Sequence, residues 1–142
     1  MKAAFLLGLL MAVPTLANAA ELLQARSLRC EFGPGATADL RSDSPSFQLS
    51  PGGMGGPMDF DSISVAQGTA RFLGNNASVD VGVAIYGSTL NFFEFTAAGS
   101  FIVTTVFPNQ TQTGRFPSVM SRHVSILGQP LPSQWIGSCW IR

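Results

Sequence analysis

Three adjacent polar residues, Ser121, Arg122 and His123, carry the side chains most able to do chemistry. Catalysis by a serine and a histidine needs the hydroxyl and the imidazole about 2.6–3.2 Å apart. On a β-strand, Ser121 and His123 share one face, but their side-chain roots are roughly 6–7 Å apart. The sequence also lacks the Gly-x-Ser-x-Gly turn that presents a catalytic serine. A hydrolase using Ser121 and His123 is therefore an alternative, and a polar strip on the solvent face is the simpler interpretation.

Arg122 lies on the opposite face of the same stretch, which it shares with apolar Phe116 and Met120. If that face is interior, the guanidinium needs a partner, because an unpaired buried charge is very costly. Glu94 is the natural candidate, since it shares a strand face with Phe92. We expect either a structural Arg122–Glu94 ion pair or an arginine that anchors the carboxylate or phosphate of a ligand in an apolar cavity.

The segment Phe92–Phe95 carries phenylalanines on both faces of a strand, and Phe101 and Phe107 follow it. One set is expected to fill the core, while the other packs under a loop, lines a cavity or meets a partner. The residues that we predict to bind a ligand are Arg122, Glu94, His123 and Phe92.

Cys30 and Cys139 are the only two cysteines, and they lie near the two ends of the chain. In an exported domain such a pair predicts a disulfide bond. A bond that closes a loop of about 110 residues stabilises the fold by about 4–5 kcal/mol in the chain-entropy account. The isolated cysteines lack the Cys-x-x-Cys spacing of a redox site, and with His123 they do not make a metal site. We expect neither a metal nor another cofactor.

The N-terminus has the order of a secretory signal peptide. Lys2 is followed by an apolar run from Ala3 to Val13 and by the small residues Ala17-Asn18-Ala19. The apolar run is shorter than the roughly 20 residues that cross a membrane. We predict cleavage after Ala19, so that residues 1–19 are the signal peptide and residues 20–142 form a single β domain in the periplasm or outside the cell.

Composition excludes two classes of function. The only lysine is Lys2 in the predicted signal peptide, which removes lysine Schiff-base chemistry from the mature chain. The remaining arginines and acids nearly balance, so the chain has no basic field to attract a nucleic acid. Charged residues make up only 11% of the sequence, which keeps a membrane barrel as an alternative. Most of the expected strands are shorter than the 9–11 residues that such barrels use, so we expect no membrane span in the mature form.

The sequence after the predicted signal peptide has no long segment with helical periodicity. It consists of short segments of alternating polar and apolar residues, separated by turns. The expected strands are Arg26–Phe32, Thr37–Leu40, Phe47–Leu49, Asp59–Val65, Thr69–Leu73, Val79–Ile85, Thr89–Thr96, Phe101–Phe107, Arg115–Ile126 and Trp135–Ile141. Gly33-Pro34-Gly35 is expected to break the first strand. The pattern predicts an all-β, antiparallel meander that forms a small, lipocalin-like barrel or a sandwich.

Two short blocks resemble a known group of proteins. Ala25–Phe32 near the start, and Met120–His123 with Pro132–Cys139 near the end, are similar to segments of small exported bacterial β-proteins of uncharacterised function. The resemblance implies an exported location and a β architecture. From the residues, we expect a non-catalytic binding module for a small apolar or anionic ligand or a protein partner; a structural envelope protein is a further alternative.

Overall fold

The computed structural model describes residues 14–40, 43–74 and 77–142, which form one short helix and eleven strands. The elements are α1 (Pro14–Gln24), β1 (Leu28–Asp39), β2 (Ser46–Ser50), β3 (Met58–Ser64), β4 (Thr69–Leu73), β5 (Ser78–Tyr86), β6 (Thr89–Phe95), β7 (Phe101–Val106), β8 (Phe116–His123), β9 (Ser125–Ile126), β10 (Gln129–Pro130) and β11 (Ser133–Ile141).

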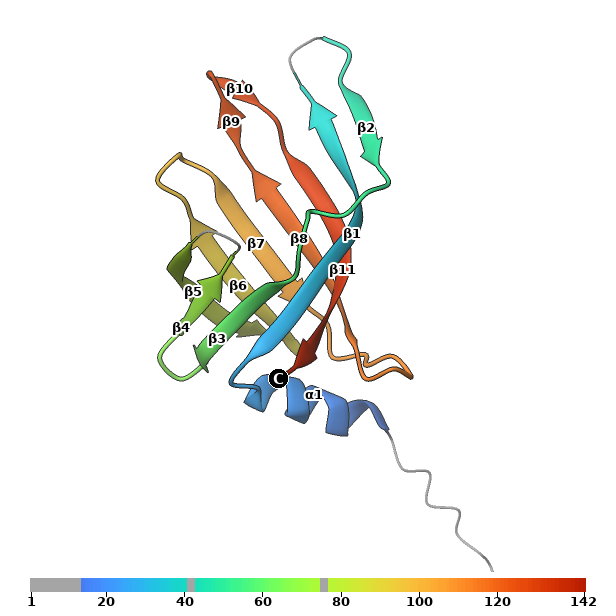
Figure 1. The fold of residues 1–142 in the computed structure, drawn as a ribbon, viewed down its shortest axis with the longest axis vertical. Helices are drawn as coiled ribbons and strands as arrows, with labels where there is room; N and C mark the ends of the chain where they lie inside the picture. Colours follow the sequence, from blue (N-terminus) through green and yellow to red (C-terminus); the bar gives the residue numbers. More distant parts are fainter. Residues whose placement is uncertain (1–13, 41–42, 75–76) are drawn as a thin grey trace, which may run out of the picture.

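Eight strands close into an antiparallel barrel, so the barrel alternative of the sequence prediction is confirmed and the sandwich is not formed. Strands β3 to β8 follow one another as a meander, β11 pairs with β8, and β1 closes the ring by pairing with both β11 and β3. Short turns join most of the meander strands, as antiparallel neighbours allow, and a longer loop, residues 107–115, joins β7 to β8. The β9–β10 hairpin extends beyond the end of β8 (Figure 1).

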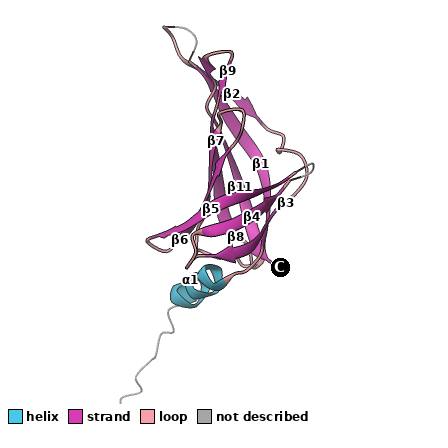
Figure 2. Ribbon diagram, turned by 90° about the vertical axis from the view of Figure 1, so that its left-hand side faces the viewer, coloured by secondary structure: helices cyan, strands magenta, loops and turns pink. Residues whose placement is uncertain are grey.

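The ring is closed at one end only. Strand β1 pairs with β3 through Leu28–Cys30 alone, and its second half pairs with β2, which has no other partner among the described strands. We call the end next to α1 the closed end, and the end that carries β2 and the β9–β10 hairpin the open end (Figures 1 and 2).

Strand β1 is continuous, so the predicted break at Gly33-Pro34-Gly35 is wrong. The pairing with β11 shifts register between Phe32 and Gly35, which is a β-bulge that accommodates one extra residue and the missing proline N–H. A Cβ on Gly35 would overlap the Trp135 ring and lie 2.6 Å from the Gln134 carbonyl oxygen. A glycine is therefore required where the indole crosses β1.

The predicted disulfide is confirmed. Cys30 and Cys139 are direct partners across β1 and β11, and the bond between them is completely buried. Closure of the barrel brings together two residues that are 109 positions apart in the sequence. The bond therefore ties the first barrel strand to the last.

The core fills the barrel toward its closed end. Phe60 and Phe92 stack with their ring centroids 3.9 Å apart, and Leu28, Leu90 and Phe116 are fully buried around them. Alternate residues of the eight barrel strands point inward, as the pleat requires. The alternation predicted for Val79–Ile85 follows this rule, since Val81 and Val83 are buried.

Helix α1 covers the closed end, an element that the strand pattern did not predict. Its Leu22 is fully buried, and Ala25 just after the helix is 6% exposed. The predicted cleavage point after Ala19 falls inside α1, so Leu22 stays with the predicted mature chain. The charge and apolar run of the predicted signal peptide, residues 1–13, lie outside the described residues.

The long strand predicted over Arg115–Ile126 is observed as β8 (Phe116–His123) and β9 (Ser125–Ile126), with an interruption at Val124. The β9–β10 pairing keeps the register of β8 and β11. Leu127 has a φ of 52° in the β9–β10 turn, so the strand conformation stops here although the residue is apolar.

Candidate functional site

A row of four residues crosses the inner face of the barrel near its open end. Glu94 on β6 pairs with Ile102 on β7, Ile102 pairs with Arg122 on β8, and Arg122 pairs with Ser133 on β11. Directly paired residues share a face of the sheet. The row continues the inner face that carries the buried Met120 and Phe92, so the face that Arg122 shares with Phe116 and Met120 is the interior one.

Arg122 has no hydrogen bond or ion pair to any described residue. Its Nε atom is buried and has no partner, although the side chain as a whole is partly exposed. The Oγ of Ser133, directly opposite, is also buried without a partner. The guanidinium carbon lies 5.5 Å from the centroid of the Trp135 ring, within the range of a cation–π contact. A buried N–H without an acceptor costs free energy, so this arrangement is a place where an acceptor oxygen would be stabilised.

The other described arginines all have oxygen partners. Arg29 donates two hydrogen bonds of 2.7 Å to Asp59, and Arg142 donates to the same carboxylate at 2.9 Å. Arg71 pairs with Asp61, and Arg115 pairs with Glu31. Arg26 donates to the Ile63 carbonyl oxygen at 3.1 Å. The hydrogen bonds from Arg29 hold the pKa of the Asp59 carboxyl below its ordinary value. Arg71 lowers the pKa of Asp61 in the same way. Arg122 is thus set apart by its lack of an oxygen partner.

The predicted Arg122–Glu94 ion pair is not formed. Ile102 stands between the two residues in the row, which places their backbones two strand spacings, about 10 Å, apart. Burial alone raises the pKa of Glu94, because no cation offsets the loss of water around the carboxylate. Two charge-bearing groups of opposite sign therefore face the open end of the barrel without neutralising each other.

A pocket of about 320 Å³ borders Arg122 at this end. Its lining residues are Ala36, Ala38, Phe47, Ser121, Arg122, His123, Pro132, Ser133 and Gln134. Most of these residues alternate with the inner row and so belong to the outer face of β1, β2, β8 and β11. The pocket therefore lies on the opposite face of the sheet from the inward-pointing guanidinium of Arg122. None of its lining residues is acidic, and the basic side chains Arg122 and His123 both border the pocket.

The structure does not join Ser121 to His123 as a catalytic pair. The Oγ of Ser121 accepts a hydrogen bond of 2.9 Å from the Nε2 of Gln134. His123 is exposed, and its ring centroid lies 6.1 Å from that of Phe101. Both residues lie on the face opposite Arg122, as strand alternation predicted.

Phe92, the fourth predicted binding residue, lies deeper in the barrel. It is 2% exposed and stacks on Phe60. The structure therefore places Arg122 and His123 on opposite faces of β8, Glu94 two strands away from Arg122, and Phe92 in the core.

Two residues next to Arg122 did not emerge from the sequence. Trp135 and Ser133 alternate with Cys139 along β11, so a disulfide inside the barrel requires all three to face inward. The inward direction of Ser133 and Trp135 could therefore be predicted from the sequence. The register that places Ser133 opposite Arg122 depends on the tertiary structure.

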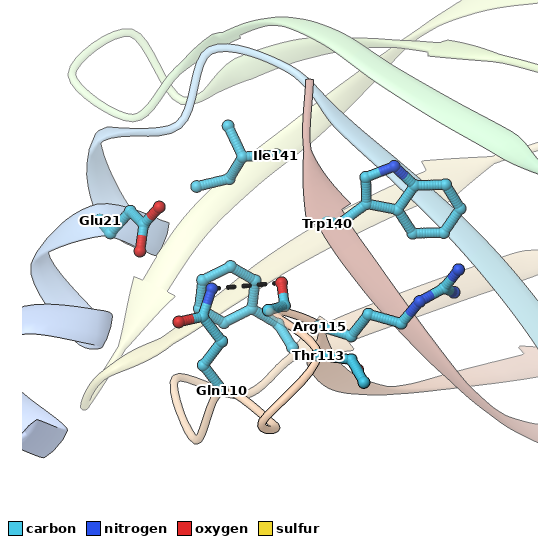
Figure 3. A pocket seen from close by; sticks show the side chains of 8 residues that line it. Glu21, Gln110, Thr113, Arg115, Trp140 and Ile141 are labelled. Carbon is cyan, nitrogen blue, oxygen red and sulfur yellow. Dashed lines mark hydrogen bonds between the residues drawn. The ribbon is translucent and has the colours of Figure 1, made fainter.

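A second pocket, of about 370 Å³, lies at the closed end between α1 and the loop that joins β7 to β8 (Figure 3). Arg115 and Gln110 of this pocket already have partners. Arg115 lies 4.1 Å from the centroid of the Trp140 ring and binds Glu31 at 2.9 Å. Gln110 donates to the Gly114 carbonyl oxygen at 3.2 Å. This pocket therefore offers a ligand less than the open end does.

Within residues 14–40, 43–74 and 77–142, no three His, Cys, Asp or Glu side chains gather as a metal site would require. The helix in the same ranges is not long and apolar enough to cross a membrane. Comparison with protein-family models, curated proteins and solved structures finds no match to this chain.

Proposed function

We propose that this chain is an exported, non-catalytic binding protein that holds a small, largely apolar molecule by its anionic group at the open end of the barrel. Arg122 anchors the anion. The observation that carries the proposal is the buried Nε of Arg122, which has no acceptor while every other described arginine has one.

The surroundings of Arg122 support an anion rather than another ligand. A carboxylate or phosphate oxygen would accept from the guanidinium and from the Ser133 hydroxyl, which satisfies two buried polar groups at once. Glu94 is the nearest acidic residue on the row, and burial favours its neutral form. The apolar residues that share the inner face with Arg122, namely Ile102, Met120 and Trp135, suit the rest of the molecule.

Isothermal titration with octanoate, benzoate and inorganic phosphate tests this proposal, with octanol as the uncharged control. Arg122→Gln is the key variant, and Arg71→Gln is its matched control because it removes the same charge from the outer face. We expect one of the anions to bind the natural chain and Arg122→Gln to weaken it by about 10-fold or more. Equal loss in both variants, or no binding of any of the three anions, would refute the anchor.

Export is a separate part of the proposal. The buried disulfide supports it, because such bonds persist in oxidising compartments. Intact-mass spectrometry of the chain produced in a bacterial host with a periplasm is the direct measurement. A mass that begins at Ala20 and lies two hydrogens below the reduced value is expected; an uncut chain with free thiols would contradict export.

A further inference from the structure

Strand β2 forms an unpaired edge of the nine-stranded sheet. It pairs with β1 and with no other described strand. All five of its residues are exposed, and Phe47 and Leu49 are 75% and 82% exposed. Figure 1 shows β2 at the outer margin of the molecule, on the side of β1 away from β11. A sheet edge of this kind presents free N–H and C=O groups to another strand.

The hydrogen bonds of β1 show which backbone groups of β2 are free. The N–H of Ala38 donates to the Pro132 carbonyl oxygen at 2.8 Å, so Ala38 faces β11. Successive residues of a strand face opposite neighbours, so Thr37 faces β2 and exchanges bonds with its partner Gln48. Phe47 and Leu49 therefore direct their N–H and C=O groups to the open edge.

The sequence of β2 complements itself. Ser-Phe-Gln-Leu-Ser has the same pattern of polar and apolar residues in both directions around Gln48. When two copies run antiparallel with Gln48 at the centre, Phe47 of each lies opposite Leu49 of the other. These are the residues whose backbone groups are free, so the pairing forms four N–H···O=C bonds and two apolar side-chain contacts.

The flanking residues limit the pairing to this register. Pro45 and Pro51 occupy the next two positions that would face the open edge, and proline has no N–H to donate. A shift by two residues would place a proline opposite Phe47 or Leu49 and lose bonds. Strand β2 also has no charged residue, which is the usual protection of a natural edge.

We propose that two copies of this chain associate through antiparallel pairing of their β2 strands about a two-fold axis at Gln48. The interface is isologous, as in most symmetric dimers. It extends the sheet of one barrel into that of the other and is small, so the dimer is concentration-dependent. The proposal is independent of the anion site, since its readout is the mass of the assembly.

A pair of double variants separates this register from any other contact. In Phe47→Lys/Leu49→Lys, each new lysine lies opposite a lysine of the second copy; in Phe47→Lys/Leu49→Glu, each lysine lies opposite a glutamate. Both variants lose the same apolar side chains. Opposite charges across a strand pair stabilise it and like charges destabilise it. We expect the Lys/Glu chain to dimerise at least about 10-fold more tightly than the Lys/Lys chain.

Sedimentation equilibrium over about 1–200 µM measures these masses. The natural chain is expected to show a monomer–dimer equilibrium. A natural chain that stays monomeric throughout, or equal behaviour of the two double variants, overturns the proposal.

A cross-linking test reports the register directly. In the proposed pairing, Gln48 of both copies is a non-hydrogen-bonded pair with Cα atoms about 4.5 Å apart, which a disulfide can span. Gln48→Cys is therefore expected to give a covalent dimer under mild oxidation. Ser46→Cys is the matched control, because it lies opposite Ser50 of the second copy and far from Ser46. Equal cross-linking of the two variants, or none of Gln48→Cys, overturns the register.

Discussion

Replacing Arg122 with methionine should stabilise the fold while removing the anion anchor. The variant keeps the length of the apolar stem and deletes the buried Nε that has no acceptor. An unsatisfied buried polar group costs about 1–3 kcal/mol. The cation–π contact of the guanidinium with Trp135 stabilises the fold by about 0.5–1 kcal/mol and offsets part of this cost. The difference predicts a gain of about 0.5–2 kcal/mol in the free energy of unfolding.

Thermal unfolding followed by circular dichroism measures this gain. A domain of about 120 residues has an unfolding entropy of about 250 cal/mol/K, so 1 kcal/mol corresponds to about 4 °C. We expect the Tm of Arg122→Met to rise by about 2–8 °C. The control is Arg29→Met, which breaks the two hydrogen bonds to Asp59 and should lower the Tm. A fall in the Tm of Arg122→Met as large as that of Arg29→Met would show that the guanidinium is structural and would refute the reasoning.

Three further predictions concern the frame around the site. Replacing both Cys30 and Cys139 with alanine should lower the free energy of unfolding by up to about 5 kcal/mol in urea titrations, because the bond closes a loop of 109 residues; no change in midpoint would contradict this. Gly137→Ala should strongly destabilise the closure of the barrel, since its Cβ would overlap a carbonyl oxygen of β1 and lie 2.6 Å from a phenylalanine ring, whereas Gly33→Ala meets nothing closer than 3.9 Å; equal Tm values would contradict it. Burial raises the pKa of Glu94 in the folded state. A protonated Glu94 is tolerated at low pH, but the free energy of unfolding falls as the pH rises from about 4 toward neutral, because the buried carboxyl must then ionise. Glu94→Gln should therefore raise the Tm more at pH 7.5 than at pH 4.5, and the reverse order would contradict the burial effect.

Strand positions were predictable because alternation is a local property. The valine series of β5 predicts one common face, and the structure buries Val81 and Val83 on it. The phenylalanines of β6 lie on both faces, and only the structure shows that Phe92 points inward. The opposite directions of Arg122 and His123 follow from the same pleat. The disulfide followed from the cysteine count and the expected compartment.

Other features depended on contacts between distant segments. The residues Gly33-Pro34-Gly35 predict a break in the strand. Pairing with β11 on both sides of this segment keeps β1 continuous, with a β-bulge at the segment. Helix α1 lacks a long apolar pattern, but Leu22 is buried because the helix packs against the closed end of the barrel. Local propensity is weaker than such tertiary contacts.

The candidate site divides in the same way. The sequence determined that Arg122 shares a strand face with Phe116 and Met120 and points away from Ser121 and His123, because side chains alternate along a strand. Only the tertiary structure decided its neighbours: Ile102 separates it from Glu94, Ser133 lies opposite it, and Trp135 covers it. The physical reason is that the register between strands is set by the closure of the whole barrel, which no single strand encodes.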